Sequence, residues 1–208
     1  MWVVKLGGSL METSALKCWL DTLVQFGDGK VVIVPGGGVF ADAVRDAQTK
    51  TGIDDAIAHQ MAVLAMDQYA MLMTGLNADL VMASSELEIA ECGWQHRAVV
   101  WKPSRMVLAD KDLPMNWDLT SDSLAAWLAL KINAEHLLIV KSLSEEIDVS
   151  IDVNSLVEAG CVDKCFAQYI SHQPFDVWML AKEDYLKITK KIKPQSPPEM
   201  GTQIITRS

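Results

Sequence analysis

Residues 31–38 have the sequence Val31-Val32-Ile33-Val34-Pro35-Gly36-Gly37-Gly38. The first four are apolar and β-branched, a composition that favours a strand. Because no polar residue alternates with them, the strand is expected to be covered on both faces, as in a parallel sheet. The proline and three glycines then end the strand in a turn. This stretch therefore predicts a buried strand followed by a glycine-rich loop.

Similar strands alternate with helical patterns along the chain. A strand at residues 2–6 also ends in glycines, and further strands are predicted at residues 98–101, 137–140, 177–180 and 202–206. Helices are predicted from apolar spacing at residues 13–26, 40–50, 54–76, 122–133, 153–159 and 183–190. This alternation predicts the α/β class: a three-layer αβα sandwich around a mainly parallel, open sheet. In such sheets ligands gather at the carboxyl ends of the strands.

Composition narrows the class of protein. A chain of 208 residues fits one domain, and a hydrophobic content of 50% is enough for a packed core. The net charge of −9 argues against a nucleic-acid partner, because phosphate backbones recruit basic surfaces. No apolar run approaches the ~20 residues that cross a bilayer, and the four cysteines are scattered. We expect a cytoplasmic protein without a membrane partner, and Cys161 with Cys165 makes a poor zinc signature, so no metal ligands are assigned.

Two glycine clusters suggest a phosphate site. Gly7 and Gly8, followed by Ser9, come directly after one strand, and Gly36 to Gly38 come directly after the next. Glycine lets consecutive backbone N–H groups converge on an anion, and a helix that starts just afterwards adds a partial positive charge. Lys5 precedes the first turn and adds a full charge. The alternative is that both clusters are only tight strand-to-helix turns.

A third cluster, residues 118–123, opens the helix expected at residues 122–133. Thr120 or Ser121 is expected to cap that helix, as Thr13 or Ser14 is for helix 13–26. Asp122 in the first turn suits the helix dipole. Capping alone is a complete structural explanation. The functional alternative is a carboxylate that holds lysines or a magnesium ion beside a phosphate site.

Taken together, these motifs resemble those of the amino acid kinase family, which includes acetylglutamate, uridylate, carbamate and isopentenyl phosphate kinases. Their order and separation fit along nearly the whole chain. The residues that carry the resemblance are Lys5-Leu6-Gly7-Gly8-Ser9, Val34-Pro35-Gly36-Gly37-Gly38, Thr120-Ser121-Asp122-Ser123-Leu124-Ala125-Ala126 and Gly201-Thr202.

The resemblance implies a single domain over residues 1–208, with an acceptor-binding lobe at about 1–135 and a nucleotide-binding lobe at about 136–208. Lys5 would stabilise the transferring phosphoryl group, and Asp122 would orient the catalytic lysines. Gly7, Gly8 and Ser9 would embrace the ATP phosphates. Gly36, Gly37 and Gly38 would face the acceptor. ATP is the implied phosphoryl donor, Mg²⁺ would be held largely by ATP oxygens and water, and a homodimer or higher homo-oligomer is expected.

The second phosphate-binding lysine is left open between two candidates. Where the family often has Thr-Asp-Val-Asp-Gly, this chain has Lys141-Ser142-Leu143-Ser144. That departure offers Lys141 as a catalytic lysine, with Lys164 as the competitor. For either, an ordinary surface lysine is the alternative.

Within the family, residues 35–42, 58–62, 65–68 and 117–122 together are most similar to the (aminomethyl)furanmethanol phosphate kinase branch of methanofuran biosynthesis. That resemblance implies a phosphate acceptor that carries an amine. Asp42 and Arg45 lie three residues apart on helix 40–50, so they share a face and would bind the amine and the phosphate. An exposed ion pair is the alternative. Other acceptors of the family, such as UMP or an amino acid, stay possible, as does a non-catalytic protein that only holds nucleotides or oxyanions.

Overall fold

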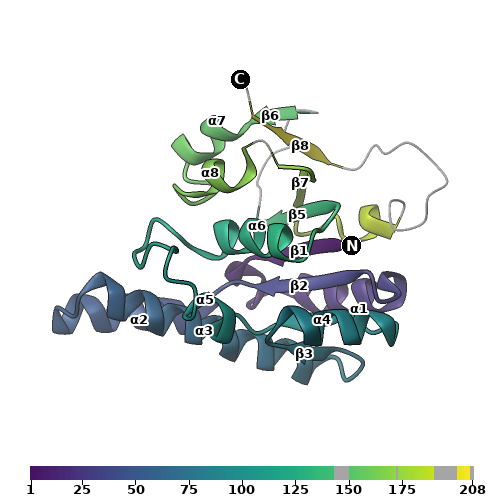
Figure 1. Cartoon of the computed structure of the whole chain (residues 1–208), viewed down its shortest axis with the longest axis horizontal. Coiled ribbons are helices and arrows are strands. Elements are labelled where there is room, and N and C mark those ends of the chain that lie inside the picture. Colours follow the sequence, from purple (N-terminus) through teal and green to yellow (C-terminus); the bar gives the residue numbers. More distant parts are fainter. Residues whose placement is uncertain (143–149, 172, 190–200, 207–208) are drawn as a thin grey trace.

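The strands in the described part of the chain form one eight-stranded sheet. The computed structural model describes residues 1–142, 150–171, 173–189 and 201–206. The order across the sheet is β3-β4-β2-β1-β5-β7-β8-β6, and Figure 1 shows this succession from β3 at one end to β6 at the other. All described pairings are parallel except that of β7 with β8. The strands are β1 (Trp2–Leu6), β2 (Val31–Pro35), β3 (Val81–Ala83), β4 (Val99–Trp101), β5 (His136–Lys141), β6 (Ser150–Asp152), β7 (Asp176–Ala181) and β8 (Thr202–Ile205).

Helices connect and cover the strands. They are α1 (Ala15–Gly27), α2 (Gly38–Thr51), α3 (Asp55–Leu76), α4 (Glu86–Trp94), α5 (Ser104–Val107), α6 (Ser121–Lys131), α7 (Val153–Glu158) and α8 (Phe166–Ile170), with short 3-10 helices η1 (Gly8–Leu10) and η2 (Tyr185–Ile188). None of the helices in the described ranges is long and apolar enough to cross a bilayer.

Two hydrophobic cores lie on opposite faces of the sheet. Because strand side chains alternate in direction, Val3 of β1 enters one core and Val4 enters the other. The first core contains Leu124 of α6 and Phe166 of α8, and the second contains Trp19 of α1. Helices therefore cover both faces, and the predicted three-layer αβα sandwich with a mainly parallel sheet is confirmed.

Several short elements differ from the sequence-based prediction. The helix predicted at residues 183–190 corresponds to the 3-10 helix η2 at Tyr185–Ile188, which begins two residues later than predicted; residue 190 and the Pro-rich stretch 194–198 lie outside the described residues. Strand β3 and helix α4 were not predicted. The start of α4 carries a usable signal, since Ser85 accepts a hydrogen bond from the Glu88 amide and the Glu88 carboxylate accepts one from the Ser84 amide.

Helix α3 is present as predicted, but its buried face differs from the apolar spacing that indicated it. Ile57 and Leu64 belong to that spacing and are 45% and 47% exposed. The buried side includes His59, Asp67 and Tyr69. Apolar residues occur nearly all round this helix, so their spacing shows a helix without showing which side faces the core.

Candidate active site

Two lysines reach the same point because of strand pairing. β1 and β5 are parallel neighbours, with Lys5 opposite Ile139 and Leu6 opposite Val140. Val3 and Ile139 point into the core that α6 covers. Lys5 and Lys141 each lie two residues after one of these, so the alternation of side chains sends both lysines to the α6 face. They meet there at the carboxyl edge of the sheet.

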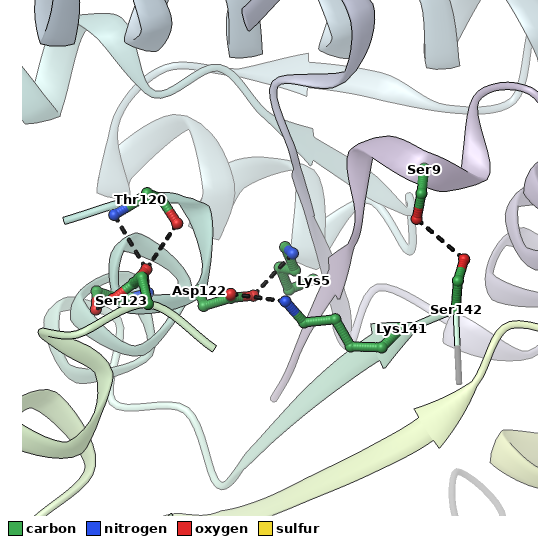
Figure 2. Close-up of polar contacts among 8 residues, drawn as sticks. Lys5, Ser9, Thr120, Asp122, Ser123, Lys141 and Ser142 are labelled. Atoms are coloured by element: carbon green, nitrogen blue, oxygen red, sulfur yellow. Dashed lines mark hydrogen bonds and ion pairs between the residues drawn. The ribbon is translucent and has the colours of Figure 1, made fainter. Parts of the chain in front are cut away.

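Asp122, in the first turn of α6, joins the two lysines. Its Oδ1 lies 2.7 Å from the Lys5 Nζ, and its Oδ2 lies 2.8 Å from the Lys141 Nζ. Figure 2 shows the two lysine side chains converging on this one carboxylate. The side chains of Lys5 and Asp122 are each 5% exposed, and that of Lys141 is 21% exposed. The result is a nearly buried cluster with two positive charges and one negative charge.

Burial changes the ionisation of this cluster. The pKa of Lys5 is lowered to about 8, chiefly by loss of hydration on burial; the negative charge of Asp122 opposes this change and the positive charge of Lys141 adds to it. For Asp122, burial alone would raise the pKa, but the charges and hydrogen bonds of Lys5 and Lys141 outweigh it and hold the pKa below its ordinary value. Asp122 is therefore ionised at neutral pH, and Lys5 is mostly protonated but close to its midpoint.

The two glycine loops pack against each other. A Cβ on Gly8 would lie 2.4 Å from the Gly38 amide nitrogen, and a Cβ on Gly36 would lie 2.6 Å from the Gly8 nitrogen. Side chains larger than hydrogen are thus excluded at both positions. Gly38 also has a φ of +54°, a conformation that glycine adopts without strain. These contacts account for the glycines structurally and bring the start of α2 beside the start of η1.

A pocket of about 400 Å³ opens at this edge of the sheet. Gly7 and Gly36 are not among the residues that line it. Gly7 lies against β5, where a Cβ would be 3.3 Å from the Val140 carbonyl oxygen, and Gly36 packs against Gly8. The structure thus brings nine of the eleven proposed site residues together around one cavity, and it lets Gly7 and Gly36 shape the loops behind it. The nine are Lys5, Gly8, Ser9, Gly37, Gly38, Asp42, Arg45, Asp122 and Lys141.

The two candidate second lysines occupy different places. Lys141 lines the pocket. The Nζ of Lys164 lies 2.7 Å from the Asp118 Oδ1, the Lys164 side chain is 75% exposed, and this residue is not among those that line the pocket. Beside Lys141, the hydroxyl of Ser142 lies 3.0 Å from that of Ser9, which joins the end of β5 to the first glycine loop (Figure 2).

Asp42 and Arg45 also line the pocket. Arg45 donates a hydrogen bond of 2.8 Å to the Asp42 carboxylate, and both side chains are more than half exposed. The Arg45 guanidinium also lies 4.4 Å from the centre of the Trp117 ring, and the Trp117 indole N–H donates to Gln48. Asp42 and Arg45 therefore form an exposed ion pair and also line the pocket. No individual binding role was predicted for Trp117 from the sequence.

The predicted N-cap positions are confirmed, but the side chains there do not cap their helices. Ser14 is the N-cap residue of α1 and Thr120 is that of α6, but neither side chain makes a capping hydrogen bond. The Thr13 hydroxyl donates to the Leu10 carbonyl. The Thr120 hydroxyl donates to the carboxylate of Asp163, a residue that motif reasoning did not single out. No local pattern marks Asp163, because it lies 43 residues away from Thr120 in the sequence.

The described residues give little support to a metal held by the protein. Among them, no group of three or more His, Cys, Asp or Glu side chains gathers closely enough to hold an ion. Cys161 and Cys165 are free thiols. Both oxygens of Asp122 are engaged by lysines. A metal in this pocket would therefore depend on ligands other than Asp122, such as nucleotide oxygens and water.

Comparison with known proteins agrees with these motifs. The sequence pattern of the amino acid kinase family matches residues 1–144. A curated relative, (5-(aminomethyl)furan-3-yl)methyl phosphate kinase from Methanocaldococcus jannaschii, is 26% identical over 145 residues. The matched stretch covers 67% of this chain and 64% of the relative, so less than two thirds of the relative's length is spanned.

Solved structures show the same fold over almost the whole chain. Uridylate kinase from Archaeoglobus fulgidus superposes with a TM-score of 0.69 at 20% identity, covering 98% of this chain and 99% of that one. UMP kinase from Bacillus anthracis gives a TM-score of 0.73 at 14% identity, covering 98% and 94%. At these identities the likeness is one of fold. Because the family pattern covers well over half of the sequence, the chain belongs to the amino acid kinase family.

Proposed function

We propose that this protein is an ATP-dependent kinase that transfers the γ-phosphoryl group to a phosphate or carboxylate acceptor. One observation carries the proposal: Lys5, Asp122 and Lys141 form a nearly buried charge cluster at the wall of the pocket, at the carboxyl edge of the sheet. Phosphoryl transfer needs positioned positive charge more than covalent catalysis by the protein. Binding without turnover would not require two lysines held by one buried carboxylate.

The chemistry follows from the arrangement. The bond between the γ-phosphorus and the bridging oxygen of ATP breaks, a new bond forms to an acceptor oxygen, and ADP leaves. Phosphate and carboxylate acceptors are already ionised near neutral pH, so the attacking oxygen needs no general base. Lys5 and Lys141 neutralise charge on the transferring group, and Asp122, which is paired with both, holds their ammonium groups at fixed positions. The glycine loops and the start of α2 add backbone N–H donors.

Magnesium fits this site only as part of the nucleotide. When bound, it would neutralise triphosphate charge. Because both Asp122 oxygens are paired with lysines, the residues present suit a metal carried by ATP oxygens and water rather than one in a protein cage.

The acceptor that we favour is (aminomethyl)furanmethanol phosphate, as in methanofuran-type cofactor biosynthesis. The Methanocaldococcus relative supports this acceptor, and so do three residues that line the pocket. There Asp42 offers an anion for an amine, Arg45 offers a cation for a phosphate, and the Trp117 ring offers a flat apolar surface. UMP kinases among the structural neighbours make UMP the first competing acceptor to exclude.

The test is an ATP-consumption screen over separate acceptors: the furan phosphate, UMP, isopentenyl phosphate, carbamate, acetylglutamate and aspartate. The furan phosphate is expected to give the highest kcat/KM. Faster turnover of another compound in the panel would contradict the proposed acceptor and would still support the proposed kinase activity. Tight ATP binding without turnover of any of them would favour a non-catalytic nucleotide-binding protein.

Asp42→Ala is expected to weaken an amine-bearing acceptor selectively. Loss of one charge-assisted hydrogen bond raises the acceptor KM by about tenfold, while the KM of ATP changes by less than about twofold. Asp46→Ala is the matched control, because Asp46 is on the same helix, pairs with Lys50 at the surface and does not line the pocket. Equal increases in both KM values for Asp42→Ala would contradict an acceptor-side role.

The rate is expected to fall at alkaline pH. Since burial lowers the pKa of Lys5 to about 8, and the protonated form is the active one, kcat/KM is highest below pH 8 and declines as pH rises through this value. The check is a pH–rate profile from about pH 6 to 10, compared with the titration of the Lys5 Nζ by ¹⁵N NMR. A Lys5 midpoint above pH 10 would exclude this lysine as the group responsible.

The family suggests that the protein acts as a homodimer or larger homo-oligomer in the cytoplasm. Exposed apolar residues on α3, such as Leu64 and Met71, would suit contact with a second copy. Light scattering of the purified protein distinguishes a monomer from a dimer.

A further inference from the structure

The loop between α7 and α8 lies directly against the start of α6. The amide of Cys165 donates a hydrogen bond of 3.1 Å to the Asp118 carbonyl oxygen, and the Lys164 Nζ lies 2.7 Å from the Asp118 carboxylate. Asp163 directly precedes these two residues in the sequence, and its carboxylate accepts more hydrogen bonds than either of them makes to Asp118. A segment from the last third of the chain is thus joined to the residues that lead into Asp122.

The carboxylate of Asp163 accepts four hydrogen bonds from two residues. Its Oδ2 accepts from the Thr120 amide at 3.0 Å, from the Thr120 hydroxyl at 2.8 Å and from the Ser123 amide at 3.0 Å. Its Oδ1 accepts from the Ser123 hydroxyl. The first amides of a helix have no partner within the helix, and a cap supplies one. Here a side chain 40 positions from Ser123 caps α6, in place of its own N-cap residue.

The geometry of the cap determines where Asp122 points. Asp122 lies between Thr120 and Ser123, and both neighbours are bound to the same carboxylate. Its own two oxygens must reach the Lys5 and Lys141 ammonium groups at 2.7 and 2.8 Å. A small rotation of this turn would break one of those contacts. Within the described residues, Asp163 neither lines the pocket nor forms an ion pair with Lys5 or Lys141.

We propose that Asp163 is a positioning residue for phosphoryl transfer, whose carboxylate holds the first turn of α6 so that Asp122 bridges both lysines. Its effect on turnover rests on the proposed function. A displacement of about 1 Å in a catalytic group costs on the order of 10²-fold in rate. Asp163→Ala is therefore expected to lower kcat by about 30- to 100-fold, with the KM of ATP changed by less than about threefold.

Three variants separate positioning from loss of stability. Asp163→Asn keeps an oxygen that accepts from both amides, so its kcat should fall by less than about tenfold, a partial rescue relative to alanine. Val153→Ala lowers stability by truncating a buried side chain of α7 and should retain kcat at temperatures where it is folded. Asp46→Asn removes an exposed carboxylate and should behave like the wild type. Equal kcat for Asp163→Ala and wild type would overturn the proposal.

A readout that needs no acceptor is the Lys5 Nζ titration, followed by ¹⁵N NMR. The groups that act on it are Asp122, Lys141 and, more weakly, Asp163. If Asp122 turns away in Asp163→Ala, the pKa of Lys5 falls by about one unit or more from its value of about 8. The double variant Thr120→Val/Ser123→Ala keeps the Asp163 charge but removes two of its hydrogen bonds. It should lower the Lys5 pKa as well.

The outcomes distinguish the two proposals. A Lys5 pKa that falls in Asp163→Ala but stays unchanged in Thr120→Val/Ser123→Ala would mean that Asp163 acts through its charge alone, which overturns positioning. A wild-type protein that turns over no acceptor, together with a lowered Lys5 pKa in both variants, would reject the kinase proposal and support the positioning role. If the wild type is active and the pKa of Lys5 is unchanged in both variants, the kinase proposal is supported and the positioning role of Asp163 is overturned.

Discussion

Lys5→Ala is expected to reduce phosphoryl transfer by about 10³-fold or more while leaving the fold intact. A cation placed beside a transferring phosphoryl group contributes on the order of 10³ to 10⁵ in rate. The fold survives because Asp122 keeps Lys141 as a partner at 2.8 Å. The measurement is single-turnover transfer from ATP to the best acceptor in the screen, with circular dichroism and thermal unfolding to confirm the folded state.

Two further variants make the Lys5 result specific. Lys5→Met keeps most of the side-chain volume and loses the charge, so it should be as inactive as Lys5→Ala. Lys50→Ala removes an exposed lysine that pairs with Asp46 and should retain the wild-type rate. Folded Lys5→Ala protein with undiminished turnover would refute the mechanism proposed for this site.

Asp122→Ala is expected to lower both activity and stability. It leaves two lysines, one of them buried, without their counter-ion, and breaking a buried pair in this way typically costs about 3–5 kcal/mol. The loss should shrink with rising pH. Without Asp122, the pKa of Lys5 falls below its present value of about 8, so at pH 9.5 Lys5 is neutral and no longer needs a partner.

Urea unfolding of the Asp122→Ala protein at pH 7 and pH 9.5 tests this expectation. Asp122→Asn provides the matched variant, because it removes the charge and leaves almost no cavity. Asp46→Ala, at the surface of α2, should be nearly neutral at both pH values. A destabilisation by Asp122→Ala that is the same at pH 7 and pH 9.5 would show that lost packing, and not unpaired charge, explains it.

The fold and the residues of the main charge cluster could be predicted from the sequence. Apolar strands such as residues 31–34 indicate a parallel sheet because their composition reports burial on both faces. The convergence of Lys5 and Lys141 follows from strand alternation once β1 and β5 are neighbours. The sequence alone left Lys141 and Lys164 as equal candidates, since the pairing of β1 with β5 is a long-range property.

Other parts of the site depend on contacts that no local pattern reveals. Thr120 has the residue type of an N-cap, yet its hydroxyl donates to Asp163 because that carboxylate is brought to α6 by the loop after α7. Trp117 was one of seven tryptophans and gained a role only through its contact with Arg45. The glycines were expected to approach a ligand. In the structure the two glycine loops pack against each other. The sequence could not show this contact, because only the tertiary structure places Gly8 beside Gly38.

The position of β1 in the sheet bears on protein synthesis. β1 precedes the other described strands in the sequence, but one of its two neighbours, β5, ends at Lys141, and β8 inserts between β7 and β6. Such pairings close long loops and are slow to form. A ribosome-bound chain that ends before residue 122 has Lys5 without the carboxylate that neutralises it. Assembly of the proposed phosphoryl-transfer site should therefore be a late event of folding, so that nascent chains are catalytically inactive.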